Sequence, residues 1–219
     1  MQRLNIDLLR LYLVTDQAAL RGRSLADVVH AAVQGGVTCV QLREKNLDFR
    51  DFLAQALMLK RLLAPYRLPL VINDRIDIAL ACRAEGVHLG QSDLPVLQAR
   101  NVLPPEVFIG WSVESMTQVL QSANLPVDYL GVSPVFATPT KTDTKTAWGL
   151  EGLAAVRAST GLPLVGIGGI HAGNATCILR AGADGLAVVS AVYSADDPRA
   201  AAAILRTLCD DELKARKRP

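Results

Sequence analysis

The chain has 219 residues, half of them hydrophobic, and a formal net charge of +2 at pH 7. Its apolar runs are interrupted well short of the ~18 residues that a membrane helix needs, and no basic patch with interleaved aromatic residues indicates nucleic-acid binding. The first ten residues carry Arg3, Asp7 and Arg10 and no apolar core, which argues against a secretory signal. We therefore expect a cytoplasmic protein with no membrane or nucleic-acid partner.

The cysteines are widely separated and form no C-x-x-C pair: Cys39, Cys82, Cys177 and Cys209. This spacing argues against a zinc site or a disulfide framework and favours buried, reduced thiols. The C-terminal segment 214–219 is basic and is interpreted as a solvated tail, while residues 1–10 are expected to form an N-terminal extension.

Eight short apolar runs predict strands, and each is followed by a segment with helical periodicity. The strands are expected near 11–16, 38–43, 69–73, 86–90, 107–112, 129–135, 163–167 and 185–190, and the helices near 24–34, 49–63, 75–84, 94–101, 115–123, 150–158, 171–181 and 197–213. Because the strand segments are continuously apolar rather than alternating, we expect parallel strands that are buried on both faces.

Eight such units favour a closed (β/α)8 barrel, a single TIM-barrel domain over residues 1–219. The alternative is a doubly wound open sheet, which more often has about five to seven strands. The chain is short for a barrel, so its loops should be lean. The longest segment without periodicity, 136–149, is expected to be a lid, a binding loop or a disordered segment.

In a parallel barrel the residues that end the strands converge on one face, where the active site lies. Gln41, Arg43 and Lys45 alternate at the end of the second strand, so their side chains should point the same way. Together the arginine and the lysine suit the oxygens of a diphosphate. The alternative is a strand end whose charges pair with Glu44 and Asp48.

Two carboxylates, Asp74 and Asp93, follow the third and fourth strands, which are neighbours in a barrel. Magnesium is commonly held by one or two carboxylates together with phosphate oxygens and water, so the pair could hold Mg²⁺. On spacing alone, each could equally cap the helix that follows it.

Glycines end the seventh strand at Gly168 and Gly169, and Val189 and Ser190 end the eighth. These two strand ends form the usual phosphate corner of such barrels. The alternative is a tight turn that needs glycine at positive φ. His88, on the fourth strand, is interpreted as a packed, hydrogen-bonded histidine rather than a catalytic one.

Five motifs then occur in order: Tyr12-Leu13-Val14-Thr15-Asp16, Gln41-Leu42-Arg43-Glu44-Lys45, Ile72-Asn73-Asp74-Arg75, Gly86-Val87-His88-Leu89-Gly90-Gln91-Ser92-Asp93 and Thr138-Pro139-Thr140-Lys141. On these motifs the chain resembles the thiamine-phosphate synthase family from about Leu11 to Val192. That family joins hydroxymethylpyrimidine diphosphate to a carboxylated thiazole phosphate and releases diphosphate and carbon dioxide. The resemblance implies the same transferase reaction here, through a pyrimidine-methyl cation, with Mg²⁺ as the cofactor.

The resemblance also implies roles for individual residues. Catalytic roles fall on Arg43, Lys45, Ser112 and Lys141; pyrimidine diphosphate binding on Gln41, Arg43, Glu44, Lys45, Asn73, Ser112 and Lys141; thiazole phosphate binding on Thr138, Thr140, Gly168 or Gly169, Val189 and Ser190; and Mg²⁺ binding on Asp74 and Asp93. The partners would be small phosphorylated substrates, with self-association into a homo-oligomer left open.

Three other functions remain as alternatives. A thiazole tautomerase or regulatory paralogue would share the barrel but lack parts of the diphosphate apparatus. A non-catalytic phosphate-binding protein would not need the paired carboxylates. An epimerase would need a general acid and a general base that face each other, and only His88 is a candidate.

Overall fold

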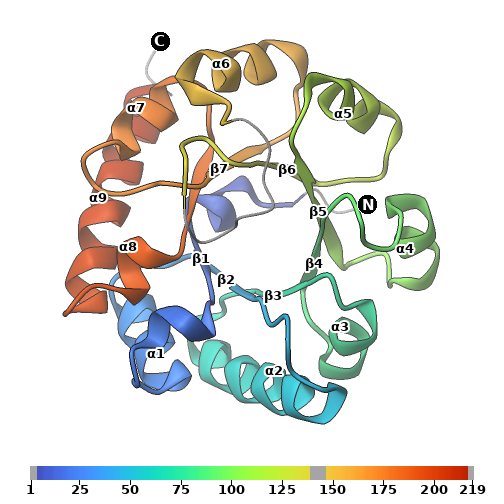
Figure 1. The fold of residues 1–219 in the computed structure, drawn as a ribbon, viewed down its shortest axis with the longest axis vertical. Coiled ribbons are helices and arrows are strands. Elements are labelled where there is room, and N and C mark those ends of the chain that lie inside the picture. The colour runs from blue at the N-terminus through green and yellow to red at the C-terminus, as the bar shows by residue number, and fades with distance from the viewer. Residues whose placement is uncertain (1–3, 139–146, 217–219) are drawn as a thin grey trace.

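The computed structural model describes residues 4–138 and 147–216, and in it eight parallel strands close into a barrel in sequence order (Figure 1). The strands are β1 Leu11–Val14, β2 Cys39–Leu42, β3 Leu70–Asn73, β4 Gly86–Leu89, β5 Phe108–Val113, β6 Tyr129–Val132, β7 Leu164–Ile167 and β8 Gly185–Val188. The pairing of β1 with β8, which brings Tyr12 opposite Ala187, completes the ring. The predicted (β/α)8 barrel is confirmed, and the open sheet is excluded.

Helices surround the barrel: α1 Leu25–Gln34, α2 Phe49–Leu63, α3 Ile76–Cys82, α4 Val96–Val102, α5 Met116–Gln121, α6 Gly149–Ser159, α7 Ala175–Arg180, α8 Ser190–Tyr193 and α9 Pro198–Arg216. Each predicted helix is present. The two largest differences from the prediction are that the short α8 was missed and that α7 begins four residues late. Asn174 explains the late start, because its side chain accepts from the His171 N–H and donates to the Gly169 carbonyl, which holds a turn there.

Helix starts follow from local capping. The Ser24 hydroxyl accepts from the Asp27 N–H to begin α1, and the Asp48 carboxylate accepts from the Asp51 N–H to begin α2. Asp48 is therefore a helix cap. Among the described residues Asp48 forms no ion pair with Arg43 or Lys45, and Lys45 pairs with Asp74 instead.

Side chains that alternate along the strands build two hydrophobic layers. On β1, Leu11 and Leu13 point outward into the layer between barrel and helices, whereas Tyr12 and Val14 point into the barrel. The inner layer comprises Leu9, Tyr12, Val14, Cys39, Val71, Phe108, Tyr129, Val165 and Ala187. Toward the carboxyl ends of the strands the inward-pointing side chains become polar, for example Gln41, Asn73 and Ser112.

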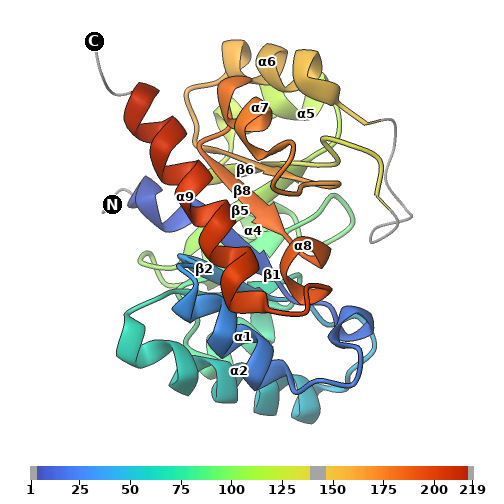
Figure 2. The same cartoon turned by 90° about the vertical axis from the view of Figure 1, so that its left-hand side faces the viewer.

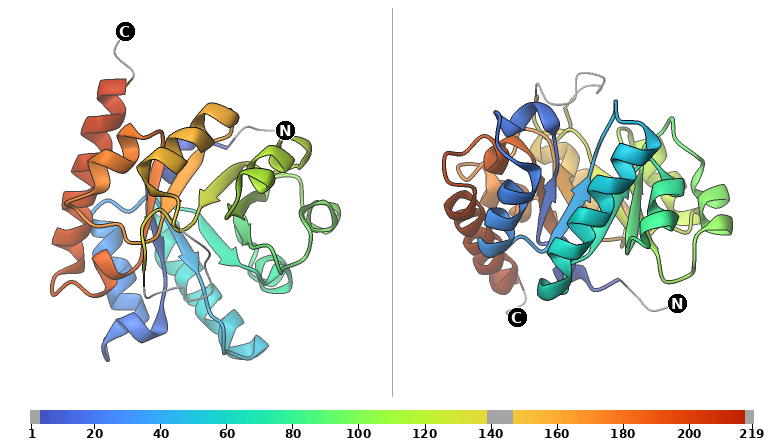
Figure 3. Two further views of the ribbon diagram at one scale, coloured as in Figure 1. Left: turned by 45° about the horizontal axis from the view of Figure 1, so that its top comes forward. Right: turned by 90° about the horizontal axis from the view of Figure 1, so that it is seen from below.

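The last helix lies alongside α1 and next to the first described residues (Figure 2). Arg10 donates to Asp210 of α9 at 2.7 Å, and Arg216 donates to the Ala183 carbonyl at 2.7 Å. The helix therefore runs three residues beyond its predicted end. These contacts lie where the strands begin, at the opposite end of the barrel from the strands' carboxyl ends (Figure 3).

Three of the four cysteines, Cys39, Cys82 and Cys209, are buried free thiols, as predicted. Cys177 is exposed instead. It lies on α7, whose inward face is formed by Ala175, Ile178 and Leu179, so position 177 faces away from the barrel. Within residues 4–138 and 147–216, no helix is long and apolar enough to cross a membrane.

Candidate active site

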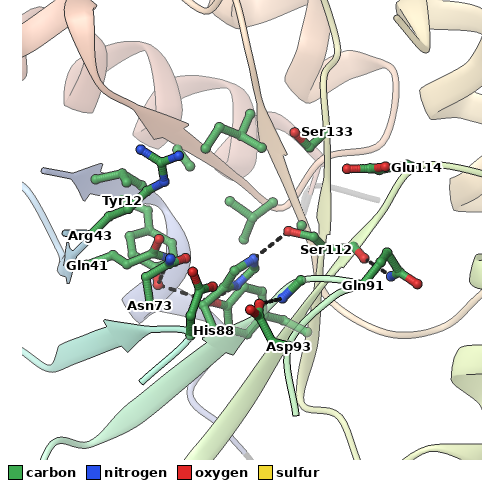
Figure 4. A pocket seen from close by; sticks show the side chains of 18 of the residues that line it. Tyr12, Gln41, Arg43, Asn73, His88, Gln91, Asp93, Ser112, Glu114 and Ser133 are labelled. Carbon is green, nitrogen blue, oxygen red and sulfur yellow. Dashed lines mark hydrogen bonds between the residues drawn. The ribbon is translucent and has the colours of Figure 1, made fainter. Parts of the chain in front are cut away.

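A pocket of about 270 Å³ opens at the carboxyl ends of the strands (Figure 4). Seven of the residues expected at the site line it together: Gln41, Arg43, Lys45, Asn73, Asp74, Asp93 and Ser112. They come from β2, β3, β5 and the loops after β2, β3 and β4. The pocket therefore brings together the side chains that were predicted from their positions at the ends of the strands.

The end of β2 supplies three of these side chains. Gln41 is only 5% exposed and donates from Nε2 to the Tyr12 hydroxyl at 2.9 Å, so it points into the barrel. The Arg43 N–H donates to Thr15 Oγ1 at 2.9 Å, which ties the chain just past β2 to the end of β1. Arg43 and Lys45 line the same pocket as Gln41, as predicted.

The two carboxylates do not act as helix caps. Helix α3 begins at Ile76 with Arg75 as its cap residue, and α4 begins at Val96; neither helix has a side-chain cap. Asp74, at φ 63°, instead accepts from Lys45 Nζ at 2.7 Å, and Asp93 accepts from the Gly90 N–H at 2.6 Å. Capping therefore does not explain either carboxylate.

Asp74 and Asp93 lie within hydrogen-bonding reach of each other. Burial and the neighbouring Asp74 raise the pKa of Asp93 above its ordinary value. Burial also acts to raise the pKa of Asp74, but hydrogen bonds from Asp93 and Lys45 outweigh it and leave that pKa lowered. The pair thus concentrates negative charge that a hard divalent cation would neutralise.

This donor set fits magnesium in its usual form. In the part of the chain that the structure describes, no group of three or more His, Cys, Asp or Glu side chains could hold a metal. Two carboxylates with substrate oxygens and water are, however, a common Mg²⁺ shell.

A second, smaller pocket of about 70 Å³ adjoins the first and shares Arg43 and Ser133 with it. Its wall holds the residues expected at the phosphate corner: Thr138, Gly168, Gly169, Val189 and Ser190. Gly168 and Gly169 have φ values of 102° and 64°, so they form a turn that needs glycine and also face the pocket. Ser190 does not end a strand but begins α8, since β8 stops at Val188.

Two groups of expected site residues are not in this assembly. Thr140 and Lys141 lie outside the described residues. Glu44 lines neither pocket. Burial, together with Asp16, raises the pKa of Glu44 to about 7, and its buried Oε1 atom has no hydrogen-bond partner among the residues described.

The sequence reading missed two tyrosines beneath the pocket. The hydroxyls of Tyr12 and Tyr129 lie 3.0 Å apart, and Tyr129 also contacts His88 Nδ1 at 2.8 Å. His88 Nε2 in turn lies 2.8 Å from Ser112 Oγ (Figure 4). His88 is thus packed and hydrogen-bonded, as predicted. The available signal for Tyr12 was its inward register with Val14.

Comparison with known proteins decides the family. The model of the family described as thiamine monophosphate synthase matches residues 11–192. The chain belongs to the thiamine monophosphate synthase family. The match covers all eight strands and both pockets, so the site described above lies wholly within the matched residues.

Curated members of the family are similar over nearly the whole chain. The thiamine-phosphate synthase of Albidiferax ferrireducens is 73% identical over 202 residues, which cover 92% of each chain. That of Vibrio campbellii is 48% identical over 196 residues, 90% of this chain and 96% of the relative.

Solved structures agree with this family. The thiamine phosphate pyrophosphorylase from Pyrococcus furiosus is 36% identical with a TM-score of 0.87, covering 95% of this chain and 98% of its own. A 3-hexulose-6-phosphate synthase, at 18% identity and a TM-score of 0.68 over 91% of this chain and 99% of its own, shares the fold alone.

Proposed function

We propose that the two adjoining pockets join hydroxymethylpyrimidine diphosphate to a carboxylated thiazole phosphate, making thiamine phosphate and releasing diphosphate and carbon dioxide. The protein is on this view a transferase of a pyrimidine-methyl group. One observation carries the proposal: a cation-rich pocket with paired carboxylates opens directly into a glycine-lined pocket, and Arg43 lies at their junction. Two anionic substrates can therefore lie side by side.

The larger pocket would hold the pyrimidine diphosphate. Arg43 and Lys45 would bind its phosphate oxygens, with Asn73 beside them and Lys141 contributed from the loop after Thr138. Asp74 and Asp93 would hold Mg²⁺, which would neutralise charge on the departing diphosphate. Gln41 and Ser112 would face the pyrimidine ring.

The smaller pocket would hold the thiazole phosphate. Gly168 and Gly169 line this pocket, and backbone N–H groups of such a glycine turn would bind its phosphate. The hydroxyls of Thr138, Thr140 and Ser190 would add hydrogen bonds, and the Val189 backbone would close the corner. Glu44, which lines neither pocket, would act on the diphosphate only indirectly, through its electrostatic interaction with Arg43.

The reaction needs no general base on the protein. The carbon–oxygen bond of the pyrimidine-methyl diphosphate breaks first, and both electrons leave with diphosphate, whose charge Arg43, Lys45 and Lys141 stabilise. The amino-substituted ring stabilises the resulting cation until the thiazole nitrogen donates its lone pair to form the carbon–nitrogen bond. Loss of carbon dioxide leaves its electron pair on the thiazolium carbon, which takes a proton. Holding both substrates in line supplies much of the rate.

The alternatives fit the site less well. A tautomerase or regulatory paralogue would not need the full set of Arg43, Lys45, Asn73 and the two carboxylates, all of which line one pocket. A non-catalytic binding protein would tolerate loss of either carboxylate. An epimerase would need an opposed acid and base, whereas both ring nitrogens of His88 are engaged by neighbours.

The direct test mixes purified protein with Mg²⁺, hydroxymethylpyrimidine diphosphate and the carboxylated thiazole phosphate, and then oxidises the product to fluorescent thiochrome. We expect fluorescence that requires Mg²⁺ and is lost in Asp93→Ala. Absence of product from folded wild-type protein would instead support the tautomerase or binding-protein reading. The cytoplasmic location and self-association suggested by the sequence stay predictions, and size-exclusion chromatography tests the second.

A further inference from the structure

The floor of the larger pocket is a continuous chain of hydrogen bonds. It runs from Gln41 through Tyr12, Tyr129 and His88 to Ser112, and no link exceeds 3.0 Å. The four residues that follow Gln41 in this series come, in order, from strands β1, β6, β4 and β5. All five residues line the pocket, and its two phenols are buried, with 1% of Tyr12 and none of Tyr129 exposed.

In this chain of hydrogen bonds, the donor and the acceptor of each link can be assigned in turn, starting from Gln41. Gln41 Nε2 can only donate, so the Tyr12 hydroxyl accepts from it and has one proton to give. Cys39 lies beside Tyr12, but a thiol is a weak acceptor, so the proton goes to Tyr129. The Tyr129 hydroxyl then donates its own hydrogen to His88 Nδ1.

The same reasoning fixes both ends. His88 accepts at Nδ1, so in the neutral ring its hydrogen is on Nε2, which donates to Ser112 Oγ. The Ser112 hydroxyl hydrogen is left to point at a ligand. At the other end, Gln41 uses one amide N–H on Tyr12, and its carbonyl oxygen accepts no hydrogen bond from the residues that the structure describes. The pocket thus offers an acceptor at Gln41 and a donor at Ser112.

We infer that Tyr12, Tyr129 and His88 are positioning residues that fix Gln41 as an acceptor and Ser112 as a donor toward the aminopyrimidine ring. That ring carries an amino group that donates and ring nitrogens that accept, so it matches both ends. The identity of the ring rests on the proposed function. The direction of the chain rests on the hydrogen bonds alone.

Two glycines make room for this chain. A Cβ at Gly110 of β5 would lie 2.3 Å from the Tyr129 hydroxyl, and one at Gly131 of β6 would lie 2.9 Å from the His88 ring. Real Cβ atoms do not approach other atoms so closely. The barrel interior is therefore shaped around the phenol and the imidazole rather than merely filled by them.

The direction can be measured without substrate. The protein has only three histidines, so long-range ¹H–¹⁵N spectra of the intact protein should resolve the His88 ring signals. These signals are assigned by their disappearance in His88→Asn. We expect neutral His88 to carry its hydrogen on Nε2. In Tyr129→Phe, which removes the donor to Nδ1, the Nε2–H form should lose its dominance. A wild-type His88 with its hydrogen on Nδ1 would overturn the inference.

Steady-state kinetics supply the second readout. Losing one buried hydrogen-bond partner should raise KM for the pyrimidine diphosphate about tenfold in Tyr129→Phe, with KM for the thiazole phosphate within about twofold of wild type. Tyr12→Phe should act in the same direction and serves if Tyr129→Phe does not fold. Tyr66→Phe is the matched control, because it removes a tyrosine–histidine hydrogen bond, to His30, far from the pocket.

The outcomes separate the two claims. Unchanged KM values in both phenylalanine variants, or equal loss for both substrates, would contradict a positioning role. No thiamine phosphate from the wild-type protein would overturn the proposed function, and the His88 spectrum would still decide the direction of the chain.

Discussion

Lys45 Nζ lies 2.7 Å from Asp74 Oδ2, so a cation expected to bind diphosphate is held by a carboxylate expected to bind metal. The lysine side chain is 53% exposed and the aspartate 20% exposed, so the pair sits at the pocket mouth. In the proposed function, Asp74 would turn to Mg²⁺ and Lys45 to the phosphate oxygens of the substrate. Each side chain would then exchange one partner of opposite charge for another, and neither charge would be left unpaired.

The first prediction concerns Lys45→Gln. Because the lysine end of the pair is half exposed, solvent screening should hold its contribution to about 1 kcal/mol, and the variant should unfold only slightly below the wild-type temperature. Its kcat/KM should fall about 100-fold, since one donor to the leaving diphosphate is gone. Arg180→Gln breaks another exposed pair, with Glu212, and should leave the rate unchanged. Equal loss of rate in both variants would contradict the role of Lys45.

The second prediction concerns the carboxylate pair. Asp93→Asn keeps an oxygen for the Gly90 N–H but removes one of two charges within hydrogen-bonding reach. Without Mg²⁺ the variant should be at least as stable as wild type, because the repulsion is relieved. With Mg²⁺, wild type should gain thermal stability as concentration rises, and the variant should gain much less.

Thermal unfolding measured at increasing Mg²⁺ concentrations tests both expectations, the stability without metal and the gain in stability with it. Asp77→Asn is the control, because Asp77 lies on α3 and pairs with Arg75 instead of facing the pocket. It should keep the wild-type response to Mg²⁺. A wild-type response in Asp93→Asn would show that the metal, if bound, does not use this carboxylate.

The third prediction concerns pH. Burial first, and Asp16 second, raise the pKa of Glu44 to about 7 in the folded protein. The folded state therefore holds this proton more tightly than the unfolded state, and stability should fall as pH rises from about 4.5 to about 7. Glu44→Gln removes this loss, so its stability relative to wild type should be greater at pH 8 than at pH 5.

Because Glu44 is only half-buried, solvent screening should hold the effect to about 1 kcal/mol. Denaturant unfolding at the two pH values measures it. Glu106→Gln changes an exposed glutamate and should show no such difference between pH 5 and pH 8. If the difference in unfolding free energy between Glu44→Gln and wild type were the same at pH 5 and pH 8, Glu44 would not be the group responsible for the pH dependence.

Most of the barrel was predictable from the sequence. Each strand is a continuous apolar run, and each main helix shows apolar residues at helical spacing. The strand-end site followed from topology, since side chains such as Arg43 and Asp93 meet wherever parallel strands end together. The role of the carboxylates did not follow, because an aspartate before a helix has the same spacing whether or not it caps. The contact of Tyr12 with Tyr129 spans 117 residues and leaves no local pattern.

The last prediction concerns Gly131→Ala. The added methyl would lie 2.9 Å from His88 Cε1, so the imidazole must move and its bond to Ser112 must lengthen or break. Overpacking of this kind typically costs about 1–3 kcal/mol of stability. The matched control is Gly161→Ala, where nothing lies within 4 Å of the new methyl.

Denaturant unfolding and KM measurements on both glycine variants test whether space for His88 matters to substrate binding. We expect Gly131→Ala to be destabilised and to raise KM for the pyrimidine diphosphate more than KM for the thiazole phosphate. Gly161→Ala should match wild type in both measurements. A Gly131→Ala variant that loses stability but keeps both KM values would mean that the imidazole fills the barrel without orienting Ser112, because the ring would have moved with no consequence for the substrate above it.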